Sequence, residues 1–129
     1  MAGIARPDET IFCGGSLIAS KWVVTASHCL YSDITKKPSD VLVVLGKYDL
    51  TIVDEEYLPR MGFEVSLIDM HYYYDYENMQ NDIALLKLVE KADLNIYTPV
   101  CLPPPDLEIT GEKAWVYGML SKNLNTNNN

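Results

Sequence analysis

Short runs of apolar and β-branched residues alternate along this chain with residues that favour turns. Each run is four to eight residues long, which is typical of strands rather than of helices. The run IALLKL would fit one face of a helix by periodicity alone, but its brevity and its neighbours favour a strand. We predict strands at Ser16–Ser20, Lys21–Ala26, Val41–Leu45, Phe63–Met70, Ile83–Leu88 and Ala114–Tyr117, with a compact turn at Ser27–Leu30. Strands at such intervals indicate an all-β barrel or sandwich.

The two ends of the chain lack this pattern. Residues 1–11 carry several charged residues and no continuous apolar run, so we expect no secretory signal peptide there. Residues 121–129 (SKNLNTNNN) contain a single apolar residue and end in three asparagines, a composition typical of disorder. We therefore predict a divergent N-terminal segment over 1–11, one β domain over 12–120 and a disordered Asn-rich tail over 121–129.

Composition and charge narrow the class of partners. The 129 residues suit one domain, and 48% of them are hydrophobic, an ordinary globular balance. Ten basic residues stand against 18 acidic ones, for a formal net charge of −8. This charge argues against a nucleic-acid partner, because binding to a phosphate backbone needs clustered cations. No apolar stretch approaches the roughly 18 residues of a membrane-spanning helix, so we expect no membrane span.

The segment FCGGSLIASKWVVTASHC carries the candidate chemistry. Its two cysteines, Cys13 and Cys29, lie at either end of a predicted strand pair, and His28 directly precedes the second. With three cysteines in the chain, at most one internal pair can form and one thiol is left over. A bridge between Cys13 and Cys29 would stabilise the fold by roughly 3 kcal/mol. It would also hold the turn that carries His28, and a fixed imidazole is what general-base catalysis requires.

Four sequence blocks together resemble a known family, the trypsin- and chymotrypsin-like serine endopeptidases (peptidase S1). In the family's order they are CGGSLI, WVVTASHC (with serine in place of the family's usual alanine), NDIALLKL and VCLP. They lie at Cys13–Ile18, Trp22–Cys29, Asn81–Leu88 and Val100–Pro103. The matched interval runs from Phe12 to about Gly118, and the combination is very specific where any single block would be weak.

The resemblance implies roles for two residues. His28 matches the catalytic histidine, which takes the proton of a serine nucleophile and later gives it to the leaving amine. Asp82 matches the aspartate that orients this histidine and stabilises its cationic form. The resemblance also implies protein or peptide substrates, no cofactor and, since the family is mostly secreted and disulfide-bonded, an extracellular protein.

The serine nucleophile itself is missing from the sequence. After Asp82 the only serine is Ser121, and neither GDSGGP nor any G-x-S-x-G motif occurs. The family fold packs two β-barrels with the active site between them, so this chain resembles the first, N-terminal six-stranded antiparallel barrel without the second. The family's first strand is likewise not found before Cys13, which predicts an incomplete barrel with an open sheet edge.

Two functions follow from this reading. The first is a serine endopeptidase of which this chain is a truncated part, inactive alone, its missing partner being the C-terminal barrel. The alternative is a non-catalytic homologue that acts as a binding or regulatory module through the apolar face left exposed.

Metal sites and the third cysteine complete the sequence predictions. Zinc binding by His28 and the cysteines is not expected, because there is no C-x-x-C pair and His28–Cys29 adjacency is a poor ligand spacing. Calcium is not expected either, because Lys47 follows Gly46 where the family places a glutamate ligand. Cys101 matches the VCLP cysteine and is predicted to be an unpaired thiol. The tyrosines of IDMHYYYDY could contact substrate or merely cover the barrel.

Overall fold

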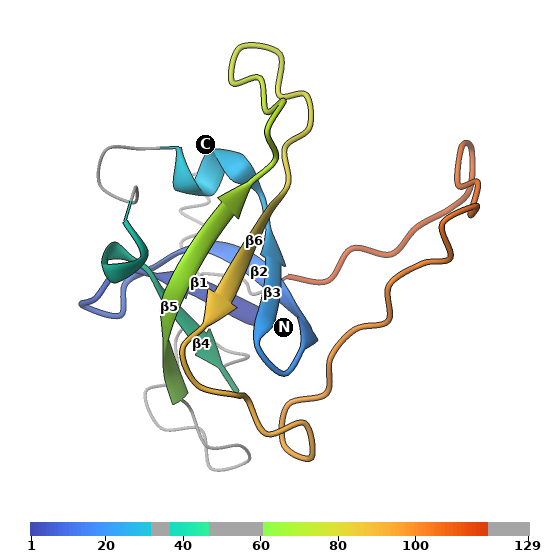
Figure 1. Cartoon of the computed structure of the whole chain (residues 1–129). Helices are drawn as coiled ribbons and strands as arrows, with labels where there is room; N and C mark the ends of the chain where they lie inside the picture. Colours follow the sequence, from blue (N-terminus) through green and yellow to red (C-terminus); the bar gives the residue numbers. More distant parts are fainter. Residues whose placement is uncertain (32–36, 47–60, 119–129) are drawn as a thin grey trace, which may run out of the picture.

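The computed structural model describes residues 1–31, 37–46 and 61–118 of the chain. Six strands close into a barrel in the order β1-β2-β3-β6-β5-β4, and every neighbouring pair is antiparallel (Figure 1). This confirms the predicted all-β class and the six-stranded barrel. The elements are β1 (Ala2–Ala5), β2 (Ile11–Ala19), β3 (Trp22–Thr25), β4 (Leu42–Leu45), β5 (Met61–Met70) and β6 (Ala84–Leu88), with 3-10 turns η1 (Ser27–Leu30) and η2 (Pro38–Asp40).

The barrel core follows from the alternation of side chains along the strands. In β6 the side chains of Ala84, Leu86 and Leu88 are buried while Lys87 is exposed, as a strand with one face on a core requires. Leu30 of η1 and Tyr97, beyond β6, extend the same cluster. The buried residues of this cluster are Ala2, Ile4, Leu17, Val23, Leu30, Val41, Val43, Leu45, Phe63, Val65, Ala84, Leu86, Leu88, Ala92 and Tyr97.

Strand β1 corrects the prediction of an open sheet edge. All four of its residues are buried, and it pairs with β2 on one side and β4 on the other. These residues belong to the barrel and not to a divergent segment ahead of it. The sequence AGIA has little intrinsic strand propensity, so its conformation depends on hydrogen bonds from both neighbours. A small residue also suits the close packing there, since a Cβ on Gly3 would lie 2.8 Å from Ile11 Cδ1.

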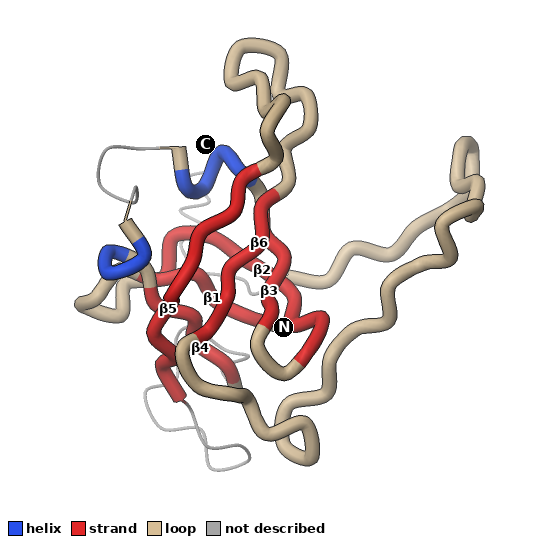
Figure 2. Tube along the Cα trace, in the orientation of Figure 1, coloured by secondary structure: helices blue, strands red, loops and turns tan. Residues whose placement is uncertain are grey.

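The strand predicted at Ala114–Tyr117 was wrong. Beyond β6 the chain packs back on the barrel as far as Val100, whose N–H donates to the Leu17 carbonyl (2.9 Å). Residues 101–118, the C-terminal arm, are then exposed; in Figure 2 they extend from the barrel, turn at the far end and run back, without forming a strand. Trp115 and Tyr117 are 86% and 82% exposed. An apolar run becomes a strand only where a neighbour supplies hydrogen-bond partners, and the described residues supply none here.

Three earlier predictions fall outside the described residues: the disordered tail at 121–129, the domain end at 120, and the loop with Lys47. No helix in the described part of the chain is long and apolar enough to span a membrane.

Candidate catalytic site

The topology of the barrel brings His28 and Asp82 together, although they lie 54 positions apart. His28 lies on η1, directly after β3, and Asp82 lies just before β6. Strands β3 and β6 are antiparallel neighbours, with Thr25 opposite Ala84. The end of one strand therefore meets the start of the other, and both side chains lie at the same edge of the barrel.

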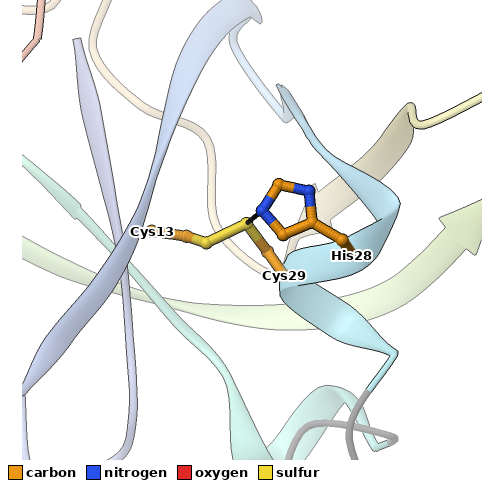
Figure 3. Close-up of side chains that lie close together, drawn as sticks. All are labelled: Cys13, His28 and Cys29. Atoms are coloured by element: carbon orange, nitrogen blue, oxygen red, sulfur yellow. Dashed lines mark hydrogen bonds between the residues drawn. A yellow bond between two sulfur atoms is a disulfide. The ribbon is translucent and has the colours of Figure 1, made fainter. Parts of the chain in front are cut away.

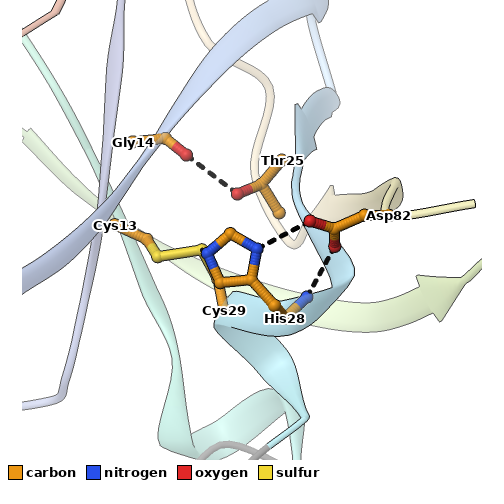
Figure 4. Close-up of a disulfide and its surroundings, with 6 residues drawn as sticks. All are labelled: Cys13, Gly14, Thr25, His28, Cys29 and Asp82. Carbon is orange, nitrogen blue, oxygen red and sulfur yellow. Dashed lines mark hydrogen bonds and ion pairs between the residues drawn. A yellow bond between two sulfur atoms is a disulfide. The ribbon is translucent and has the colours of Figure 1, made fainter. Parts of the chain in front are cut away.

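Asp82 holds His28 at two points (Figure 4). One carboxylate oxygen lies 2.7 Å from Nδ1 of the imidazole, and the other accepts the backbone N–H of His28 at 2.8 Å. The imidazole side chain is 48% exposed and the Asp82 side chain 23% exposed. The ring is thus fixed in orientation while much of its surface remains accessible.

The same hydrogen bonds keep Asp82 ionised. The hydrogen bond to the His28 ring, followed by that from the His28 backbone N–H, lowers the pKa of Asp82 below its ordinary value of 3.8. A carboxylate only accepts hydrogen bonds, so the neutral imidazole carries its proton on Nδ1. Nε2 is then left with a free lone pair, which is the atom a general base uses.

Two hydroxyl groups fasten the backbone around this pair. The buried Ser27 hydroxyl donates to the Ile83 carbonyl (2.7 Å), which joins η1 to the residue after Asp82. The Thr25 hydroxyl donates to the Gly14 carbonyl (2.8 Å) and ties β3 to β2. Sequence reasoning noted Ser27 only as a departure from the usual alanine. The one available signal was the serine itself, a polar residue at a position where the family usually has alanine.

The predicted Cys13–Cys29 disulfide is confirmed. It links β2 to η1, with the two Cα atoms 6.2 Å apart, and so anchors the turn that carries His28 (Figure 4). Cys101 lies on the C-terminal arm as an exposed free thiol.

Within the described residues no hydroxyl lies within hydrogen-bonding distance of His28 Nε2. Nδ1 of the ring contacts the Asp82 carboxylate, and Nε2 lies 3.5 Å from Cys29 Sγ. The hydroxyls of Thr25 and Ser27 are directed to backbone carbonyls instead. The site therefore contains a proton acceptor and its orienting carboxylate, but no nucleophile among these residues.

Comparison with known proteins is consistent with this geometry. The family model described as Trypsin matches residues 1–128. The chain belongs to the trypsin family. It is 36% identical over 104 residues to human mannan-binding lectin serine protease 1, covering 71% of this chain and 14% of that protein. It is 39% identical over 101 residues to mouse chymotrypsin-C, covering 78% of this chain and 35% of that protein.

A third relative shows the same partial coverage. Human tissue-type plasminogen activator is 34% identical over 108 residues, which is 80% of this chain but 18% of that protein. The trypsin-family chain thus spans between 14% and 35% of the length of these three relatives. The resemblance to trypsin-like serine endopeptidases is confirmed.

A tyrosine cluster borders the His–Asp pair of this trypsin-family barrel. Tyr31 stacks on Tyr76 (ring centroids 4.9 Å apart) and meets the edge of Tyr74 (5.6 Å). Burial, and then the negative charge of Asp82, raises the pKa of Tyr74 above 10.0. Its phenol therefore stays neutral beside the site. His71, whose Nδ1 accepts the Tyr73 N–H (3.2 Å), contacts neither His28 nor Asp82.

One cluster in the described part of the chain has the composition of a metal site. The ligand atoms of Cys13, His28 and Cys29 lie within 4.8 Å of one another (Figure 3). In the oxidised chain both sulfurs are committed to the disulfide and offer no thiolate. Lys47, which follows Gly46 where the family places a calcium ligand, lies outside the described residues.

Proposed function

We propose that this chain supplies the proton-relay half of a serine endopeptidase that cleaves peptide bonds in proteins. His28 is the general base and acid, and Asp82 orients it. The nucleophilic serine comes from polypeptide outside this sequence, in the position that the family's second barrel occupies. The observation that carries this proposal is the attachment of His28 to Asp82 through both ring and backbone.

The relay works through Nε2 of His28. As the serine oxygen attacks the peptide carbonyl carbon, its proton passes to Nε2 and the ring becomes an imidazolium. The Asp82 carboxylate, 2.7 Å from Nδ1, stabilises that charge. The proton then passes to the leaving amine as the C–N bond breaks, which leaves an acyl-enzyme. Water then attacks the acyl carbon and gives its proton to Nε2. His28 returns that proton to the serine oxygen as the ester C–O bond breaks and the acid is released.

The proposal includes inactivity of the 129-residue chain alone. No nucleophile lies beside Nε2 in the described residues, and the family's serine motif does not occur in the sequence. A fluorophosphonate probe should therefore label no serine. Mouse chymotrypsin-C serves as the positive control for labelling. A labelled serine in this chain, confirmed by mass spectrometry, would overturn the inactivity.

The roles of the two residues are tested in a chimera. This chain replaces the matched 101-residue segment of mouse chymotrypsin-C, which supplies the serine. We expect His28→Ala and Asp82→Asn to lower kcat of the chimera by roughly 10⁴-fold. His71→Ala is the matched control and should leave kcat unchanged, since His71 does not contact the pair.

Two other outcomes bear on the proposal. If His28→Ala retains full activity, the assigned role is wrong. If the folded chimera neither labels nor hydrolyses peptides, the alternative of a non-catalytic binding or regulatory module is favoured. The exposed apolar side chains of the C-terminal arm would suit such a module.

We also propose an extracellular location. The support is the Cys13–Cys29 disulfide, since such bonds persist mainly in oxidising compartments.

A further inference from the structure

We propose that reduction of the Cys13–Cys29 disulfide converts the site into a Zn²⁺ site, with two thiolates and Nε2 of His28 as ligands. Two cysteines and one histidine are a known zinc ligand set, which leaves a fourth position open for water. The three side chains converge from β2 and from η1 (Figure 3). Spacing along the chain disfavours zinc, but folding brings Cys13 of β2 next to His28 and Cys29 of η1.

The distance between imidazole and sulfur already fits a zinc ion. Nε2 of His28 lies 3.5 Å from Cys29 Sγ. Around a tetrahedral zinc with bonds of about 2.3 Å to sulfur and 2.0 Å to nitrogen, the S···N separation is about 3.5 Å. This pair of ligands therefore needs little rearrangement. Once the S–S bond is broken, rotation about the Cα–Cβ bonds allows the two sulfurs to separate by the amount a shared ion requires.

The contact between Asp82 and His28 also points to zinc. Histidines that bind zinc usually donate their other ring N–H to a carboxylate, which fixes the tautomer and the ring orientation. Asp82 makes this contact with Nδ1 at 2.7 Å and also accepts the His28 backbone N–H. The lone pair of Nε2 is thus oriented before any metal binds. The negative charge of Asp82 further favours a cation on the far side of the ring.

The chemistry balances with a phosphine reductant. Phosphine and water convert the disulfide into two thiols and a phosphine oxide. Binding of Zn²⁺ then forms two Zn–S bonds and one Zn–N bond, and the two thiol protons are released to solvent. Before reduction the sulfurs are bonded to each other, so the oxidised chain has no such site.

Metal binding and the proposed relay compete for one atom. Both use the lone pair of Nε2, so a zinc-loaded chain could not accept a proton from a serine. This consequence rests on the proposed function. The metal site itself does not, because its test below measures metal binding and no hydrolysis.

The experiment uses Co²⁺ as a spectroscopic probe, followed by competition with Zn²⁺. The full chain carries Cys101→Ser, so that Cys13 and Cys29 are its only thiols. After anaerobic reduction with phosphine we expect one Co²⁺ per chain, with sulfur-to-cobalt charge-transfer bands and the intense visible bands of tetrahedral cobalt. Zn²⁺ should abolish these bands, and the oxidised chain should show none.

Matched histidine variants decide whether Nε2 is a ligand. We expect His28→Gln to weaken Co²⁺ binding by more than about 100-fold, and Asp82→Asn to weaken it by about 10- to 100-fold. His71→Gln, the only other histidine variant available, should bind as the parent does. Equal binding by His28→Gln and His71→Gln, or cobalt bands in the oxidised chain, would overturn the proposal.

Circular dichroism covers the case in which reduction unfolds the barrel. If metal then restores the β-sheet signal in the parent and in His71→Gln but not in His28→Gln, the site is supported. If metal restores it in all three chains, or in none, the proposal fails.

Discussion

Both oxygens of the Asp82 carboxylate form hydrogen bonds with His28, one with Nδ1 of the imidazole and one with the backbone N–H. The first contact sets the proton position on the ring, and the second sets where the ring stands relative to η1. A change at Asp82 therefore affects both the ring orientation and the stability of the turn.

At the scale of this residue we predict a pH-dependent stability. The pKa of Asp82 is lowered below 3.8 in the folded chain, by the His28 ring first and the backbone N–H second. The stabilisation is therefore complete above about pH 5 and is lost as pH falls through about 4 towards the folded pKa. We expect the stability deficit of Asp82→Asn to be constant near neutral pH and to shrink below about pH 4. Urea unfolding of both chains across this range measures it.

The control for this prediction is Asp106→Asn. Asp106 is exposed on the C-terminal arm, and its variant should follow the parent chain at every pH. A deficit of Asp82→Asn that stayed constant down to pH 2.5 would show that the carboxylate charge contributes nothing to folding.

At the scale of elements, β2 packs closely against β3 beside Gly15. A Cβ at this position would lie 2.9 Å from the Val24 carbonyl oxygen and 3.0 Å from Val23 Cγ1. The adjacent Gly14 has nothing within 4 Å of the same point. Two neighbouring glycines on one strand therefore differ completely in what a methyl group would meet.

This difference gives a paired prediction. We expect Gly15→Ala to lower the free energy of unfolding by about 1–3 kcal/mol, because backbone atoms of β3 must shift to accept the methyl group. Gly14→Ala should change it by less than about 0.5 kcal/mol. Chemical denaturation of the two variants provides the comparison, and equal destabilisation would contradict the packing described here.

The elements also show where sequence patterns succeed. Strands β3 to β6 and the second half of β2 were predicted from apolar runs, because a face turned to the core selects apolar residues at alternate positions. The first half of β2, Ile11–Gly15, was not predicted. Strand β1 was missed because Ala and Gly carry almost no strand signal, and pairing on both sides makes it a strand. The run Ala114–Tyr117 has that signal but lacks a partner strand within the described residues.

At the scale of the whole molecule, a closed barrel contrasts with the exposed C-terminal arm. Within the described arm, backbone hydrogen bonds close local turns, such as the one from the Leu107 N–H to the Pro104 carbonyl. The loop between β5 and β6 is also exposed, with Tyr72 90% accessible, but Asp75 pairs with Gln80 within it. Exposure alone therefore does not equal local instability.

Limited proteolysis should separate these two regions. With added chymotrypsin, we expect the first cuts at Trp115 and Tyr117, roughly tenfold faster than at Tyr72, because a protease needs an extended, unpaired backbone. Mass spectrometry of early time points identifies the products. A Trp115→Ser/Tyr117→Ser double variant should lose those earliest products. Cleavage at Tyr72 before Trp115 and Tyr117 would show that the β5–β6 loop opens more readily than the C-terminal arm, against this prediction.

For this protein the sequence alone determined the family, the β-barrel class, the His28–Asp82 pair as a candidate and the possible Cys13–Cys29 bridge. These follow from local patterns and motif blocks, which are readable one segment at a time. Only the tertiary structure decided that Ala2–Ala5 closes the barrel, that Ser27 joins η1 to Ile83, and that Nε2 lies 3.5 Å from a cysteine sulfur. Each of these depends on contacts between strands distant in sequence, and no local pattern encodes such a distance.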